Sequence, residues 1–216
     1  RKDIDLGVKV VLVPEGVTLI GSGGVISHGT LIGNKTKIEG NKVLFDNIRI
    51  KGSWIVNEIS TDLFASLDYE NALRDVLALA SPDVNNTIEI KNGEYLVSAK
   101  SFQGALSVCS NTTMIIDGII KLIPNDYKGC YVLYVKDAEN VVIKGSGEIV
   151  GDKKEHKGKE GEWGHGINVI GSHNVIIQDL KVQNCWGDCI YVGGKSTNVI
   201  IKGCKLDEGR RQGISV

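Results

Sequence analysis

The sequence predicts an all-β protein folded as a right-handed parallel β-helix, with a short capping helix near its N-terminal end. The chain has 216 residues with 27 glycines and only 3 prolines, a composition typical of many short strands joined by tight turns. Three C-terminal segments repeat the same alternation of side chains at 164–169, 187–192 and 211–216. Apolar side chains such as Ile167, Ile190 and Ile214 are expected on one face, and Asn168, Tyr191 and Ser215 on the other. One such repeat cannot bury its apolar face alone, but coils stacked about 4.8 Å apart pair every strand with the next.

A second series of repeats lies between these segments. Asparagine precedes an apolar Val-x-Ile strand at Asn140, Asn174 and Asn198, and Thr113 begins a weaker copy. Asparagine tolerates the left-handed backbone conformation and can cap a turn with its amide. Each of these asparagines is therefore expected in a turn before a strand.

The N-terminal part has a different pattern. Residues 1–67 are expected to form a β-rich cap region, and residues 68–216 the coils. Short strands are expected at 10–13, 18–20, 30–32, 36–38, 43–45, 48–50, 87–90 and 95–97. An amphipathic helix is expected over about 69–80, capped by Asp68, where it would cover the open end of the coil stack. The last repeat stops at Val216 within its first strand, so we expect further coils beyond it.

Three segments resemble the pectate-lyase-like β-helix superfamily. Residues 87–97 are similar to its early strand-Gly-Tyr signature, and residues 142–152 and 186–190 resemble segments of polygalacturonase-type glycoside hydrolases. The resemblance covers about residues 80–216 and implies the β-helix fold and a polysaccharide ligand, in an enzyme or in a tailspike-like protein. Function on a shared fold depends on the site.

The catalytic pattern of those hydrolases is only partly present. Their paired aspartates are reduced here to Asp188, and Gly-His-Gly, at His165, comes one coil before that aspartate rather than one coil after it. The family's closing Arg-x-Lys is absent. The resemblance therefore assigns a catalytic role to Asp188 alone.

Alignment of the coils nevertheless gathers reactive side chains on one ridge. His165, Asp188 and Gln212 fall in one column, and Trp163, Trp186 and Arg210 fall in a second column beside it. Carboxylate and imidazole groups can move protons, arginine binds carboxylates, and indoles can stack on sugar rings. The candidate catalytic residues are Asp188, His165, Glu162 and Arg211. The candidate substrate-binding residues are Trp163, Trp186, Arg210, Gln212 and Tyr131. Tyr131 aligns with His165 one coil earlier and is expected to extend the groove or to stack at the edge of the core.

Each candidate also has a structural interpretation. Asp188 fits a turn cap, His165 fits a hydrogen-bonded structural residue, and the arginines could neutralise nearby acids. The polar loop 152–161 is either a solvated excursion or a wall of the substrate groove.

Three functions compete for this ridge. Hydrolysis needs two carboxyl groups, for which Asp188 and Glu162 are candidates. A lyase needs a base and a cation to neutralise a uronate carboxylate, and His165 with Arg210 or Arg211 could provide them. The third is glycan binding without turnover. We expect a polysaccharide-degrading enzyme acting on acidic, uronate-containing or related glycans, with a glycoside hydrolase favoured over a lyase, and a tailspike or fibre-type binding protein as the alternative.

The remaining expectations concern partners and location. A net charge of −1, with mixed signs along the chain, argues against nucleic acid, and no segment approaches the ~20 apolar residues that span a bilayer. The five cysteines lack metal-ligand spacing. No cofactor or metal is expected; calcium suits carboxylate ligands, but no clustered spacing supports it. The expected protein is a monomer or homotrimer that binds polysaccharide outside the cell or on its surface, or in a virion tail.

Overall fold

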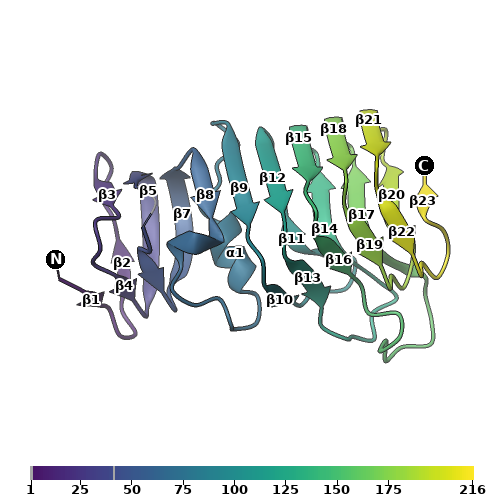
Figure 1. Cartoon of the computed structure of the whole chain (residues 1–216), viewed down its shortest axis with the longest axis horizontal. Coiled ribbons are helices and arrows are strands. Elements are labelled where there is room, and N and C mark those ends of the chain that lie inside the picture. Colours follow the sequence, from purple (N-terminus) through teal and green to yellow (C-terminus); the bar gives the residue numbers. More distant parts are fainter. Residues whose placement is uncertain (1, 41) are drawn as a thin grey trace.

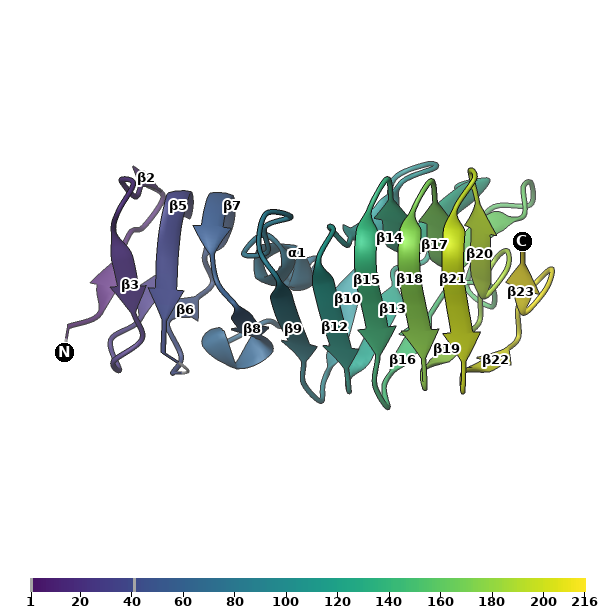
Figure 2. The same cartoon turned by 90° about the horizontal axis from the view of Figure 1, so that it is seen from above.

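The protein is almost entirely β-structure, with its strands paired in parallel. The computed structural model describes residues 2–40 and 42–216. Their strands form five sheets and follow one another along one long axis, with β1 (Ile4–Asp5) and β23 (Ile214–Ser215) at opposite ends (Figure 1). Figure 2 shows the strands of one sheet lying side by side. No helix among the described residues is long and apolar enough to cross a membrane.

Three of these sheets form the C-terminal part. The first contains β8 (Glu58–Ser60), β9 (Asn86–Ile90), β12 (Thr112–Ile116), β15 (Glu139–Lys144), β18 (His173–Gln178) and β21 (Thr197–Lys202). The second contains β10 (Glu94–Val97), β13 (Ile119–Leu122), β16 (Glu148–Val150), β19 (Lys181–Gln183) and β22 (Lys205–Asp207). The third contains β11 (Gly104–Ser107), β14 (Gly129–Lys136), β17 (Trp163–Ile170), β20 (Ile190–Gly193) and β23 (Ile214–Ser215). From β9 onward, the chain visits the three sheets in turn, and each strand pairs with the strand three further along. One passage of the chain through the three sheets is here called a coil.

The N-terminal part contains two smaller parallel sheets. One is built from β1 (Ile4–Asp5), β4 (Ile26–Ser27) and β6 (Phe45–Asp46), and the other from β2 (Val10–Leu12), β5 (Thr30–Glu39), β3 (Thr18–Ile20) and β7 (Arg49–Ile55). The two strands expected at 30–32 and 36–38 are one strand, β5, with a register shift between Gly33 and Thr36. The division at residue 67 stays a prediction, although β8 precedes it and pairs with β9.

The helix is shorter than the sequence predicts. A 3-10 turn, η1 (Thr61–Leu63), precedes it, and α1 spans Ala72–Leu77 rather than about 69–80. Its N-cap is Asn71, in the left-handed conformation at φ 64°, and not Asp68. The Asn71 amide oxygen accepts a hydrogen bond from the Ser98 backbone N–H at 2.9 Å. This bond to the coil, which the local sequence does not reveal, coincides with a later helix start.

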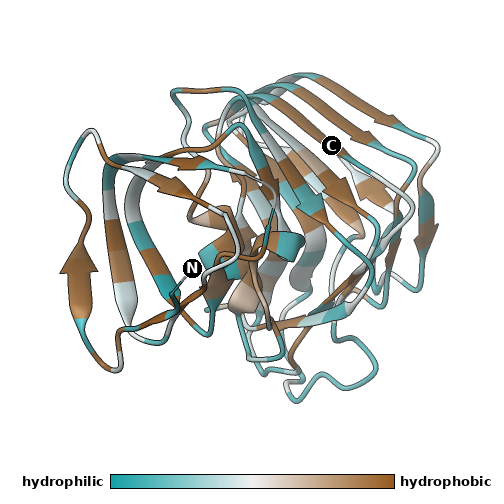
Figure 3. Cartoon of the chain, turned by 60° about the vertical axis from the view of Figure 1, so that its left-hand side comes forward, coloured by the Kyte–Doolittle hydropathy of each residue, from teal (hydrophilic) through white to brown (hydrophobic). Residues whose placement is uncertain are grey.

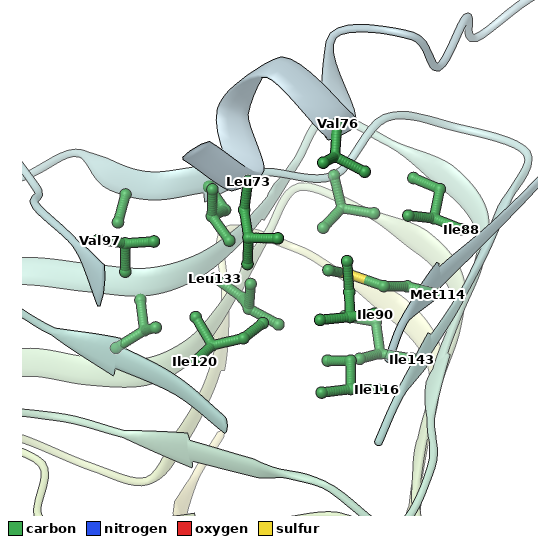
Figure 4. Packing of buried hydrophobic residues seen from close by; sticks show 14 of the residues in the cluster. Leu73, Val76, Ile88, Ile90, Val97, Met114, Ile116, Ile120, Leu133 and Ile143 are labelled. Carbon is green, nitrogen blue, oxygen red and sulfur yellow. The ribbon is translucent and has the colours of Figure 1, made fainter. Parts of the chain in front are cut away.

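Helix α1 covers the free edges of two sheets. Strands β10 and β11 are the outermost strands of their sheets, and unpaired edges of this kind invite aggregation. Arg74 donates from Nε to the Ala105 carbonyl at 2.9 Å and from Nη2 to the Ser98 carbonyl at 2.6 Å. The helix therefore satisfies polar groups at these edges, while Leu73 and Val76 on its other side enter the core (Figure 4).

The core is continuous from coil to coil. Inward residues at equivalent strand positions stack on one another, as Ile88, Met114 and Ile143 do in the first sheet. Hydrophobic residues recur on strand after strand along the molecule (Figure 3). The predicted alternation is confirmed in β17 and β20, because Ile167 and Ile190 are fully buried and pair in register. In the third repeat Ile214 and Val216 are exposed.

A column of asparagines holds the turns in register. Asn111, Asn140, Asn174 and Asn198 all adopt positive φ between 52° and 58°. The amide of Asn140 donates to Asn111 at 3.1 Å, Asn174 donates to Asn140 at 3.2 Å, and Asn198 donates to Asn174. The predicted left-handed conformation of Asn140, Asn174 and Asn198 is confirmed, but each is the second residue of a strand rather than part of a turn before it. Their amides bond mainly to one another across coils.

Replacement of Asn174 by alanine should lower the free energy of unfolding by about 2 kcal/mol. Alanine is disfavoured in the left-handed region, and the substitution removes two amide hydrogen bonds. Urea denaturation gives the measurement. The matched control is Asn174→Gly, which keeps the backbone accessible and should cost only about 1 kcal/mol. If both variants lose the same unfolding free energy, the left-handed backbone conformation at residue 174 does not disfavour alanine.

Candidate functional site

The predicted ridge borders a groove on the outer face of the third sheet. The groove has a volume of about 460 Å³. Its lining residues are Phe102, Tyr131, Trp163, His165, Asn168, Ile170, Tyr191 and Arg211. A larger hollow of about 750 Å³ adjoins β5, β7 and β8, but it contains none of the predicted site residues. Most of the groove surface is therefore aromatic or apolar, and one arginine lies in it.

Three rings form a stack along this groove. Tyr131 pairs in register with His165, as predicted, and their ring centroids are 5.7 Å apart with planes 6° apart. The Tyr191 ring lies 4.9 Å from the His165 ring at 13°. Sequence reasoning placed Asn168 and Tyr191 on the outward face but did not assign them to the site, and it missed Phe102 altogether. The outward position in the alternating pattern was the available signal for Asn168 and Tyr191.

His165 is held as a neutral imidazole. The backbone N–H of Asp188 donates to its Nδ1 at 3.1 Å, so the neutral ring carries its proton on Nε2. The side chain is only 3% exposed, and burial lowers the pKa of His165 to about 4. The nearby Asp188 carboxylate opposes this shift but does not outweigh the burial. At neutral pH the groove therefore contains an uncharged histidine.

Asp188 lies behind His165 and is fully buried. Its Oδ1 accepts the Gln212 backbone N–H at 3.1 Å. Its Oδ2 lies 3.6 Å from His165 Nδ1 and has no hydrogen-bond partner among the described residues. The structure thus brings the predicted column together, but Gln212 contributes its backbone, and the Asp188 side chain has no exposed surface.

Two carboxylates flank one guanidinium at the end of the groove. Arg211 Nε lies 3.7 Å from Asp188 Oδ1 and 3.9 Å from Glu162 Oε1. These two oxygens are therefore no more than about 8 Å apart, a bound compatible with either geometry of glycoside hydrolysis. The Glu162 side chain is 49% exposed, so Glu162 is the carboxylate of this pair that solvent reaches.

The two predicted tryptophans do not form one exposed column. The His156 ring stacks on Trp186 with centroids 4.0 Å apart, and the Arg210 guanidinium lies 3.8 Å from the indole centroid. Arg210 also donates to the Gly161 carbonyl. Trp186 and Arg210 are thus engaged with other parts of the chain, contrary to the expectation that both face a ligand. Trp163 is 42% exposed and lines the groove beside Phe102.

The loop 152–161 is anchored rather than freely solvated. The side chains of Asp152 and His156 are 1% and 0% exposed, and Asp152 Oδ2 lies 2.9 Å from His156 Nδ1. The same oxygen accepts the Asn125 backbone N–H at 3.0 Å. Because His156 stacks on Trp186, this buried cluster holds the segment that leads directly into Glu162.

Comparison with known proteins shows two relatives from Bacillus subtilis, while no family model matches the chain. The SPbeta prophage-derived uncharacterized protein YorA is 26% identical over 75% of this chain, and the uncharacterized protein YclG is 31% identical over 69% of it. These matches cover 32% and 30% of the two relatives, so the chain spans about a third of the length of the curated relatives it matches.

Among solved structures, one similar chain comes from Parabacteroides merdae and carries the name "putative glycosyl hydrolase". It is 17% identical, with a TM-score of 0.49, over 70% of this chain and 84% of that chain. A likeness this distant decides neither fold nor chemistry.

The His165 ring should stay neutral down to about pH 4. Its protonation favours the unfolded chain, in which the pKa is near 6.5, so this group should lower stability as pH falls from about 6.5 to about 4, by an amount on the order of 3 kcal/mol. Histidine NMR titration measures the midpoint directly, and His165→Gln identifies the signal. A midpoint at or above 6.5 would contradict the desolvated environment.

Removal of the Trp186 indole should release the loop. Trp186→Ala is expected to cost about 3 kcal/mol in unfolding free energy, because it leaves a cavity beside His156. It should also speed tryptic cleavage at the loop lysines 153, 154, 157 and 159. Trp163→Ala is the control and should leave loop cleavage unchanged, since the Trp163 indole packs against Phe102, whereas the ring that stacks on His156 is that of Trp186. Unchanged cleavage in Trp186→Ala would mean that other contacts anchor the loop.

Proposed function

We propose that this protein binds polysaccharide along the aromatic groove and acts on it as a glycoside hydrolase. The observation that carries the proposal is the groove itself, in which a half-exposed indole, Trp163, lies beside the stacked rings of Tyr131, His165 and Tyr191. Aromatic faces bury large apolar area at a small entropic cost, which suits the apolar faces of sugar rings.

The parallel topology supports a finer fold proposal. Three sheets visited in turn, with each strand paired to the strand three further along, are what a right-handed parallel β-helix of the pectate-lyase-like superfamily would require. In such a fold, outward side chains of neighbouring coils line up across the strands, and an extended glycan could follow them.

Hydrolysis is favoured over elimination by the charges near the groove. Glu162 and Asp188 supply two carboxyl groups around Arg211, whereas a lyase would need a free cation to neutralise the uronate carboxylate. Arg211 already has two acidic neighbours, and Arg210 lies over Trp186.

Binding without turnover is the second candidate. The complete burial of the Asp188 side chain favours it, because both carboxyl groups of a hydrolase must act at the scissile bond. In this case Asp188 would orient His165 and Arg211, and the groove would serve as a receptor-binding surface.

We further propose that the protein works outside the cell or on its surface, with a virion tail as the alternative. Polysaccharides are abundant on and outside cell surfaces, and the name of one relative places that relative in a prophage. The expected assembly is a monomer or a homotrimer.

Substitution of Glu162 by glutamine should reduce turnover about a hundredfold or more, the usual contribution of a general acid or base. Asp188→Asn should do the same while keeping the fold. The measurement is the release of new reducing ends, followed together with the ultraviolet absorbance of an unsaturated lyase product. Glu160→Gln is the matched control. Glu160 lies two residues before Glu162, and its exposed side chain pairs with Lys128 rather than with Arg211.

Each result separates the candidate functions. An ultraviolet-absorbing product would replace hydrolysis with elimination. Glycan binding with no product from the unmodified protein would leave the receptor function and remove the enzyme. Full activity in Glu162→Gln would exclude Glu162 from the chemistry.

A further inference from the structure

We propose that the aromatic groove accepts an uncharged segment of the glycan and discriminates against uronate rings. This inference rests on the proposed glycan binding and names the substrate class of the same site. It departs from the acidic substrate that the sequence predicts, because that expectation depended on arginines free to bind carboxylates.

The charges around the groove do not attract an anion. Arg211, which lines the groove, has Glu162 and Asp188 within 4 Å of its Nε. The positive charge of Arg211 is therefore outnumbered by two carboxylates, so this end of the groove has an excess of negative charge. A carboxylate entering beside it would be repelled rather than paired.

No other cation that the structure describes lines the groove. The Arg210 guanidinium lies over Trp186 and donates to the Gly161 carbonyl. Lys128 pairs with Glu160. His165 is enclosed between two tyrosine rings and accepts a hydrogen bond at Nδ1, so it stays neutral and adds no positive charge.

The polar groups of the groove favour a ligand that donates hydrogen bonds. Asn168 lines the groove, and its side-chain Oδ1 is buried with no hydrogen-bond partner among the described residues. A buried acceptor without a donor is costly. A hydroxymethyl group can supply the missing donor, whereas the ionised carboxylate that replaces it in a uronate can only accept. Tyr131 and Tyr191, on either side of His165, add ring surface for the apolar faces of the same sugar.

The test compares chemically matched glycans on the same protein. Oligosaccharides of galacturonate, mannuronate and glucuronate polymers are each measured before and after their carboxyl groups are reduced to hydroxymethyl groups. Trp163 emission reports occupancy, since Trp54 is buried and Trp186 is covered by His156 and Arg210. Trp163→Phe, which should lose the emission change, confirms the origin of the signal.

The reduced form of at least one glycan should bind about tenfold more tightly than its carboxylated parent at low salt, as expected for one repelled charge near the surface. The difference should shrink as salt is raised, because exposed charges are screened. Tighter binding of a carboxylated parent, weakening with added salt, would overturn the inference while leaving glycan binding intact. Failure of all the glycans to bind would instead overturn the proposed function and the inference with it.

Discussion

In-register pairing of parallel strands is the constraint on which the rest of the structure depends. The circuits of the chain differ in length, with 34 residues between Asn140 and Asn174 but 24 between Asn174 and Asn198. The asparagine column nevertheless keeps equivalent turns aligned, because each amide bonds to the one in the neighbouring coil. Outward residues of β14, β17 and β20 therefore meet in one groove, although they come from circuits of unequal length.

The loop 152–161 accounts for much of the extra length of the circuit between Asn140 and Asn174. The contacts that anchor this loop determine where Glu162 lies. Asp152 and His156 are buried as a pair, and His156 stacks on Trp186 from the next coil. These contacts fix the segment that precedes Glu162. Glu162, the exposed carboxylate of the site, thus owes its position to packing at some distance from the groove.

The sequence predicts well which residues of neighbouring coils lie side by side. It does not predict which of those side chains are covered by other parts of the chain. Alternation and spacing alone place Tyr131 beside His165 and Asp188 beside His165, because period and register depend on the backbone. The same reasoning misjudged Trp186. It aligned Arg210 with Trp186 in one column but did not show that the guanidinium covers the indole, and His156, which stacks on the indole, lies in a loop outside the repeat. It also misplaced the helix start, because Asn71 bonds to Ser98 on a distant strand. Contacts made by loops and helix ends depend on tertiary packing, which periodicity does not encode.

Burial divides the predicted catalytic column into two kinds of group. His165 and Asp188 are almost inaccessible, and desolvation keeps the histidine neutral, so His165 contributes the surface of its ring to the groove floor. Glu162 and Arg211 retain exposed surface at the groove's end. Recognition by this site therefore depends on aromatic area and on hydrogen bonds to hydroxyl groups, and any bond cleavage depends on the carboxylate that solvent can reach.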